Sequence, residues 1–495
     1  MTSVRARACA VLAGLAGAAA LAGCASLAPP VPAPHPGVPK TFPPPPVAAS
    51  PAGSAGSAVG AAAGVAANAR GTTPAAGGAV TPLAWREFFV NPVLQKLIEE
   101  ALANNRDLRV SVLNVERARA QYRIQRAQRL PTINAVAAES RMGGGSSAPL
   151  APDTYTVGVG LSDFEIDLFG RVRELSRAAL EQYFALDATQ RAARLALVGE
   201  VANAWLTLGA DRELLDVSRE TLKSQQESYD LTRRQHDLGA VSGLDVAQAQ
   251  TTVASARADV ARFTGQVAAD RDALVLLVGQ PIEAQRLPDS LVSSTVLAPL
   301  PSPLSSDVLL RRPDVIAAEY ALRSANADIG AARAAFFPSI TLTTSAGTIS
   351  SELSGLFHGG SGFWSFSPQI NLPIFDPGRL QGNLDVARAN EKIALAQYEK
   401  AIQSGFREVA DGLALAQTLA EQQRAQQTLV DAAARAHALS QERYRAGRDS
   451  YLVLLDAQRT LYAAQQALIG TRLAAETNHV ALYTALGGEW SERSP

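Results

Sequence analysis

The chain has 495 residues but only two cysteines, Cys9 and Cys24, and both lie close to its N-terminus. A chain with so few thiols has no disulfide framework and no cysteine-based metal site. Charge of one sign is also lacking, because 45 Lys and Arg residues face 46 Asp and Glu residues. No basic footprint for nucleic acid is therefore visible, and we expect no nucleic-acid partner.

The usual signs of chemistry are missing as well. The sequence has no G-x-S-x-G, no P-loop and no G-x-G-x-x-G motif opening a helix. Its histidines are scattered without ligand spacing: His35, His236, His358, His437 and His479. We expect no enzyme activity, no catalytic residues, no metal and no cofactor other than a covalent lipid.

Residues 1–23 have the layout of a signal peptide, in which a basic start precedes a short apolar run. The run ends in "LAGC", Leu21–Cys24, which resembles the lipobox of bacterial lipoproteins. In those proteins the cysteine is acylated and becomes the first mature residue, so Cys24 is the expected lipidation site. An Asp two residues after the lipobox cysteine resembles an inner-membrane retention signal. This chain has Ser26 at that position, which favours the outer membrane. The alternative is an ordinary signal peptide with a chance cysteine.

Residues 24–82 are rich in proline, alanine and glycine and lack the large apolar residues of a core. We expect a loose tether between the lipid and the body. No long apolar run follows Cys24, so no further transmembrane helix is predicted, and a membrane span would have to be built from strands.

The body contains one long internal repeat. "RAQRLPTI" matches "RAAFFPSI", and "HDLGAVSGLDVAQAQTTV" matches "YRAGRDSYLVLLDAQRTL" about 208 residues later. The repeats are expected at 83–290 and 291–490, with a tail at 491–495. Each repeat reads as short helices, an extended hairpin and a pair of very long helices.

The long helices are predicted because good helix formers run on without proline. No proline occurs between Pro152 and Pro281, or between Pro377 and Pro495. The expected bounds of the four helices are about 171–237, 243–279, 379–446 and 450–487. A heptad spacing in the first predicts a supercoiled seam at Val201, Leu208, Leu215, Leu222 and Tyr229.

Four segments alternate apolar with small or polar residues, which is typical of strands. Their expected bounds are about 131–141, 154–168, 338–348 and 363–375. Each has the length of a tilted membrane strand. Four strands cannot close a barrel, and lipid tolerates no open edge, so several copies would have to assemble. The alternative to membrane strands is a soluble hairpin with one solvent-exposed face.

Glycines mark the turns between the long helices. Gly239 and Gly243 are placed where the first helix must end and reverse, and Gly447 does the same in the second repeat. Asp449 or Ser450 can cap the helix that follows. Both hairpins should have their tips at one end.

The segment "LLRRPDVIAAEYALRSANADIGAARAAFFPSITL" closely resembles the signature of outer-membrane factors, the exit ducts of tripartite efflux pumps. "WREFFVNPVLQKLIEEALANNRDL" resembles their first helices, and the resemblance covers about 83–490. The lipobox resembles that of the lipoprotein, NodT-like branch that serves resistance-nodulation-division pumps. The tether is longer than that branch leads us to expect.

The resemblance implies a mostly α fold with a β part, assembled as a homotrimer. Three copies would form a twelve-stranded outer-membrane β-barrel continued by a twelve-helix periplasmic α-barrel. It also implies a passive duct for drugs or other small toxic compounds, an inner-membrane transporter, and a periplasmic adaptor that contacts the tips. A duct for type I protein secretion and a lipid-tethered coiled-coil scaffold are the alternatives.

Leu452, Asp456 and Arg459 fall at i, i+4 and i+7 on one helical face. By resemblance, the matching positions line the periplasmic constriction, so these residues are the predicted gate. Threefold symmetry would bring the Asp456 carboxylates into one ring, with Arg459 bridging them to neighbouring helices. The alternative is a surface i, i+3 pair of little energetic consequence.

Overall fold

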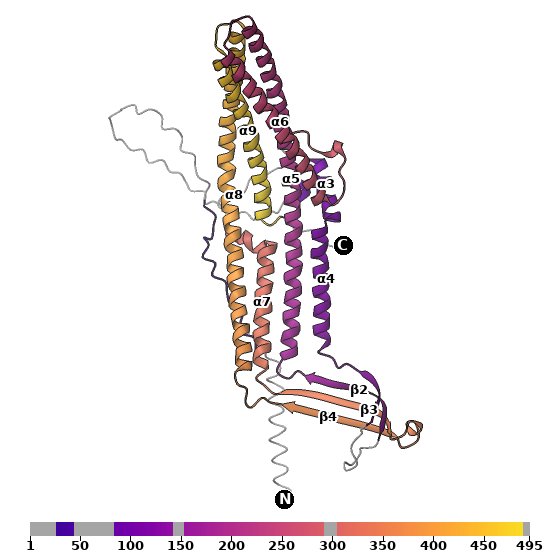
Figure 1. Cartoon of the computed structure of the whole chain (residues 1–495). Coiled ribbons are helices and arrows are strands. Elements are labelled where there is room, and N and C mark those ends of the chain that lie inside the picture. The colour runs from indigo at the N-terminus through magenta and orange to yellow at the C-terminus, as the bar shows by residue number, and fades with distance from the viewer. Residues whose placement is uncertain (1–25, 44–83, 142–152, 292–303, 489–495) are drawn as a thin grey trace, which may run out of the picture. The chain divides into compact units, whose positions relative to one another are not determined.

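The structure is a computed structural model that describes residues 26–43, 84–141, 153–291 and 304–488. The expected signal peptide, Cys24, residues 44–82 and the C-terminal tail lie outside the described residues. Within the described part, the elements in chain order are α2 (Trp85–Phe88), α3 (Pro92–Asn104), α4 (Arg106–Ala127), β1 (Asn134–Ser140), β2 (Thr154–Ile166), α5 (Arg171–Asp237), α6 (Gly243–Val278), η1 (Ala284–Arg286), η2 (Ser306–Arg311), α7 (Pro313–Ala334), β3 (Ser339–Ser350), η3 (Leu353–Gly355), β4 (Gly362–Asn371), α8 (Arg379–Arg445) and α9 (Tyr451–Ala485) (Figure 1).

The body divides into two compact units. The first comprises the described parts of 1–35, 112–189 and 314–401, and it holds the sheet. The second comprises the described parts of 36–111, 190–313 and 402–495, and it holds both helical hairpins. The long helices α5 and α8 contribute residues to both units.

The sheet has four antiparallel strands in the order β1-β2-β3-β4. Its two outer strands, β1 and β4, each have one edge without a partner in this sheet. Large apolar side chains on β4 alternate with small polar ones, and Trp364 and Phe366 are 79% and 59% exposed. The alternation that predicted strands is therefore present, although β1 and β4 are shorter than expected.

The repeat is visible in the helix bounds. Helices α5 and α8 both have 67 residues and begin at Arg171 and Arg379, 208 residues apart. Helix α5 has the bounds expected from the sequence, and the ends of α6, α8 and α9 differ from expectation by at most two residues. Among the described residues, no helix combines the length and apolar character needed to cross a membrane.

The main core of the second unit lies where α3, α5, α6 and α9 meet. Phe88 stacks on Tyr483 with ring centroids 4.4 Å apart. Of the predicted seam, Val201, Leu208 and Leu215 are buried. Leu222 and Tyr229 are only half-buried, so the seam loosens toward the tip.

The first described residues are not a loose tether. In the first unit, Ser26 Oγ donates to the buried Glu174 carboxylate at 2.7 Å, and Arg333 donates to the Leu27 carbonyl at 2.9 Å. In the second unit, Phe42 is buried and stacks on Phe406 at 4.7 Å. The expectation of a free spacer is therefore wrong for residues 26–43. Proline-rich chain needs few hydrogen bonds to stay extended, so a few anchors suffice to hold it.

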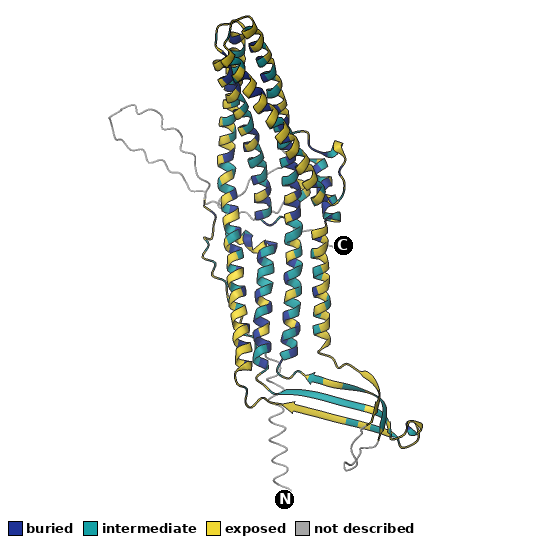
Figure 2. Ribbon diagram, viewed as in Figure 1, coloured by how far each residue is buried: buried dark blue, intermediate teal, exposed yellow. Residues whose placement is uncertain are grey.

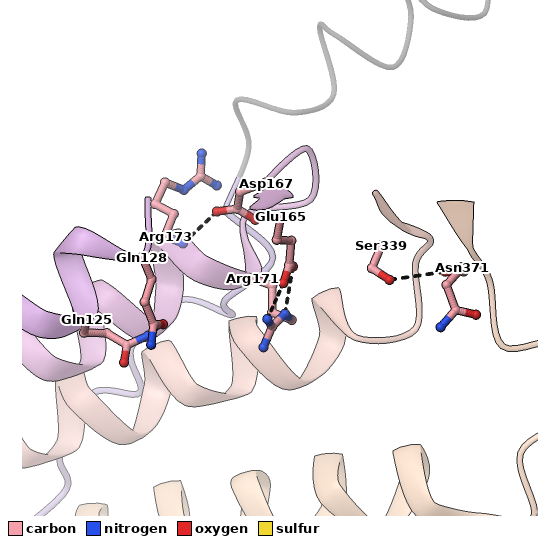
Figure 3. A network of polar contacts seen from close by, with 8 residues as sticks. All are labelled: Gln125, Gln128, Glu165, Asp167, Arg171, Arg173, Ser339 and Asn371. Carbon is pink, nitrogen blue, oxygen red and sulfur yellow. Dashed lines mark hydrogen bonds and ion pairs between the residues drawn. The ribbon is translucent and has the colours of Figure 1, made fainter. Parts of the chain in front are cut away.

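Polar contacts fix the passage from β2 into α5 (Figure 3). Glu165 forms an ion pair with Arg171, and the Asp167 carboxylate accepts from the Arg173 backbone N–H at 2.7 Å. A carboxylate at a helix N-terminus satisfies a free N–H and interacts favourably with the helix dipole. These contacts hold the first turn of α5 to the end of the strand.

Candidate functional site

The two hairpin tips have the same backbone design. Gly239 and Gly447 have φ of 76° and 65°, the left-handed region that glycine enters without strain. Ala240 N–H donates to the Gln235 carbonyl at 2.8 Å, and Arg448 N–H donates to the Arg443 carbonyl at 2.9 Å. Both helices therefore end in the same glycine-based motif, as the sequence predicted.

The starts of the two returning helices differ. Gly243 does not end a helix, since it is the first residue of α6. Ser242 precedes it and forms a capping box with Asp245, whose carboxylate accepts from the Ser242 backbone N–H at 3.0 Å. Sequence reasoning missed this box, although Ser followed three residues later by Asp was its signal.

In the second hairpin Ser450 holds the N-cap position, but its side chain makes no capping bond. Asp449 instead accepts two hydrogen bonds from the Arg443 guanidinium, at 2.7 and 2.8 Å. The bonds from Arg443 hold the pKa of Asp449 below its ordinary value. The expected capping by Asp449 or Ser450 is therefore wrong, because an ion pair across the turn takes the carboxylate.

Tyrosines join the two tips. The Tyr444 hydroxyl lies 2.7 Å from Thr232 Oγ1 and donates to Gln235 Oε1 at 2.9 Å. The Tyr451 hydroxyl lies 3.4 Å from Thr252 Oγ1, and both rings are buried beside Ala249, Leu454 and Leu455. Burial raises the pKa of both tyrosines. Both tips lie at one end, as predicted, whereas the tyrosines that hold them there were not foreseen.

The helices have both exposed and buried residues near the tips (Figure 2). Close to its tip, α9 has one exposed face, and this face carries the predicted gate residues. Leu452 is 60% exposed, and Asp456 and Arg459 are exposed too. The opposite face, with Leu455 and Gln458, is buried. The helical spacing thus brings the three predicted residues onto one open stripe.

Asp456 and Arg459 do not form the surface pair considered above. In the described part of the chain, neither side chain has an ion pair within 4.0 Å. The matching position of the first hairpin is Gln248, which is half-buried, and Leu244 beside it is 66% exposed. A charged, unpaired stripe therefore belongs to α9 and not to α6.

In the described ranges no cluster of three or more His, Cys, Asp or Glu side chains could hold a metal ion. The tips and the stripe offer hydrogen-bonding and charged groups on exposed helices, which suits contacts with other protein surfaces or with a solvated passage.

Comparison with known proteins identifies the fold. The family model described as outer membrane efflux protein matches residues 97–280 and 304–488, one segment in each repeat. The chain belongs to the outer membrane efflux protein family. It is therefore an outer-membrane efflux protein, and it has the two-repeat architecture expected from the sequence.

Two curated relatives come from Pseudomonas putida: an antibiotic efflux pump outer membrane protein, ArpC, and a toluene efflux pump outer membrane protein, TtgC. Each is 47% identical over 427 residues, which is 85% of this chain and 88% of the relative. The open state of the Neisseria gonorrhoeae MtrE outer membrane channel is 38% identical. It superposes with a TM-score of 0.80 over 94% of this chain and 98% of its own.

Proposed function

We propose that three copies of this chain form a passive exit duct through the outer membrane. The sheet supports assembly, because β1 and β4 each offer an edge that lipid would not tolerate unpaired. Twelve strands from three copies would close a β-barrel with a lumen, and the exposed apolar side chains of β4 would face lipid. The helical hairpins would form the α-barrel in the periplasm.

The gate is the stripe on α9. Threefold symmetry would place the Leu452 side chains around the axis and the Asp456 carboxylates in a ring. Three close carboxylates repel, and Arg459 of each copy would offset this by bridging to neighbouring helices. The observation that carries this proposal is that Asp456 and Arg459 are exposed and lack an ion pair among the described residues of one copy, while Gln458 beside them is buried.

The partners follow from this arrangement. A periplasmic adaptor would contact the tips around Gly239, Gly243 and Gly447, and an inner-membrane resistance-nodulation-division transporter would supply energy. A lipid on Cys24 would anchor the N-terminus in the outer membrane. Its neighbour Ser26 is bonded to Glu174 near the start of α5, within the unit that holds the sheet, which supports an anchor on that unit. The chain itself would catalyse no reaction.

The substrates are small toxic compounds rather than proteins. This rests on the relatives, two of which are named for the efflux of antibiotics or toluene. Selection would take place in the transporter, since the stripe is an exposed helix face rather than a pocket. Protein secretion through the same fold is the rival that a transport assay would reveal.

Conductance in planar lipid bilayers tests the duct and its gate separately. The purified trimer should form small pores, and Asp456→Ala should raise their conductance several-fold by removing the charged ring. Gln248→Ala changes the matching position of the first hairpin and should leave conductance unchanged. A protein that never conducts would contradict the proposed duct. Equal effects of the two substitutions on conductance would contradict the proposed gate.

A further inference from the structure

A cavity of about 170 Å³ lies behind the stripe, between α5, α8 and α9 of the second unit. Most of the residues that line it have polar side chains: Val217, Glu220, Thr221, Ser224, Gln225, His437, Gln458, Leu461, Tyr462 and Gln465. Gln458 belongs to the buried face of α9, whose exposed face carries Asp456. The cavity therefore lies between the predicted gate helix and the two helices behind it.

Three buried polar atoms on this lining have no hydrogen-bond partner among the described residues. They are Gln225 Oε1, Gln458 Oε1 and His437 Nε2. Gln225 and Gln458 are only 6% and 5% exposed, so bulk water does not satisfy them. Buried polar groups in native proteins are nearly always bonded, which indicates that something small and polar occupies this space.

The protein itself fixes what Gln458 presents. Its Nε2 donates to Ser228 Oγ at 3.1 Å, and Ser228 Oγ donates to the Ser224 carbonyl at 3.0 Å. Because the serine proton is already used, the amide of Gln458 cannot be reversed, and its Oε1 must be an acceptor at the cavity. Burial lowers the pKa of His437, so the imidazole is neutral and its free nitrogen can accept or donate.

The polar lining is not a by-product of the duplicated fold. The positions 208 residues away from Ser224 and Gln225 are occupied by Ala432 and Ala433, and the position matching Tyr462 is Ala254. The repeat keeps a glutamine at Gln250, which is exposed. The polar cavity thus arises from side chains that only this face of the bundle has.

We propose that this cavity is a binding site for a cluster of ordered water molecules that link α9 to α5 and α8. Water can donate to both glutamine oxygens and bond to His437 in the same cluster, and each molecule needs roughly 30 Å³, so several fit. Such a link exchanges partners readily. If α9 carries the gate as proposed above, the site gives that helix a water-mediated contact on the face opposite the stripe, and such a contact can adjust when the helix moves.

A high-resolution structure of the intact trimer provides the direct test. We expect two or more water molecules within hydrogen-bonding distance of Gln458 Oε1, Gln225 Oε1 or His437 Nε2. A dry cavity, or one closed by a direct bond between Gln225 and Gln458, would overturn the proposal. Density that appears only in ammonium buffer and not in sodium buffer would also overturn it, since the occupant would then be a small cation.

Hydroxyl-radical footprinting tests the same site in solution without relying on conduction. Bound water should make Tyr462 and His437 react more than their exposure predicts. Gln225→Met should reduce their labelling several-fold, because this side chain bonds to no other described residue, so the substitution removes its amide from the cavity without breaking a bond within the protein. The control Gln250→Met, at an exposed position, should change nothing. Labelling of Tyr462 and His437 that is unchanged in Gln225→Met would contradict the water site, whether or not the protein conducts.

Discussion

The two helical hairpins share a backbone but not a set of side-chain roles. Helices α5 and α8 have equal lengths, and both end at a glycine with positive φ. At matching positions, however, Gln250 is exposed while Gln458 is buried, and Gln248 stands where the other copy has Asp456. The comparison teaches that the repeat preserves helix length and turn geometry, whereas the environment of each helix determines which of its side chains are buried and what they contact.

The largest expected difference between the hairpins lies in their packing at the tip. Leu454 is 1% exposed in the tip core, while Val246 at the matching position is half-buried. Leu454→Ala should lower the local opening free energy by about 2–5 kcal/mol, because it leaves a cavity. Val246→Ala should cost clearly less.

Hydrogen exchange of the tip amides measures both effects, because it reports local opening. Similar losses in the two variants would mean that the tips are packed alike, which would contradict the expected difference between the hairpins.

The second difference concerns pH. Burial and the neighbouring Asp270 carboxyl raise the pKa of Asp211 to about 7, against an ordinary value of 3.8, while Arg262 opposes the shift. The native state then binds this proton more tightly than the unfolded chain. The resulting stability is full below pH 3.8 and is lost as the pH rises through about 7.

We therefore expect the Tm of the protein in detergent to fall between pH 5 and pH 8. Because Asp211 is partly exposed, the fall should be smaller than it would be for a fully buried carboxyl. Asp211→Asn should flatten that fall. The matching positions of the second hairpin, Leu419 and Asn478, cannot titrate, so Asn478→Ala serves as a control that lowers Tm without changing its slope. An Asp211→Asn protein with the slope of the wild type would contradict this account.

The turns themselves should respond equally. A Cβ at Gly239 or Gly447 would meet no heavy atom within 4 Å, so only the left-handed backbone resists substitution. Gly239→Ala and Gly447→Ala should each cost about 1 kcal/mol. Chemical denaturation followed by tip hydrogen exchange checks this, and a large loss in only one variant would reveal an unequal strain.

The last expected difference concerns the caps. Ser242→Ala removes a capping box and should cost about 1 kcal/mol in the opening of the first turn of α6. Ser450→Ala removes no capping bond and should be silent in α9. Exchange rates of the first-turn amides decide between the two, and a matching loss in Ser450→Ala would show a cap that forms in solution.

Much of the architecture could be predicted because its causes are local. Two long stretches of helix formers without proline, each with a glycine in the turn that follows the first long helix, are enough to place the ends of α5 and α8 within one residue. Period-two alternation located all four strands, although it missed their ends by up to four residues. Helical spacing predicted that Leu452, Asp456 and Arg459 share one face, while their selection as a gate came from the resemblance.

The rest of the candidate site depends on contacts between distant residues. Asp449 was expected to cap α9, but the Arg443 guanidinium provides a stronger partner. The tyrosine bridge from Tyr444 to Thr232 joins residues 212 positions apart, which no local pattern encodes. The binding of residues 26–43 to the body was missed for the same reason.

The sequence by itself determined the elements of this protein: long helices, short strands, paired turns and their repetition, because these follow from propensity, periodicity and glycine geometry within a few neighbouring residues. Only the tertiary structure decided which copy of a repeated residue is buried. Gln458 lines a cavity because α5 and α8 cover it, while Gln250 remains open to solvent. Burial is a property of the packed helices, and the same dipeptide "AQ" therefore acquires different surroundings in the two hairpins.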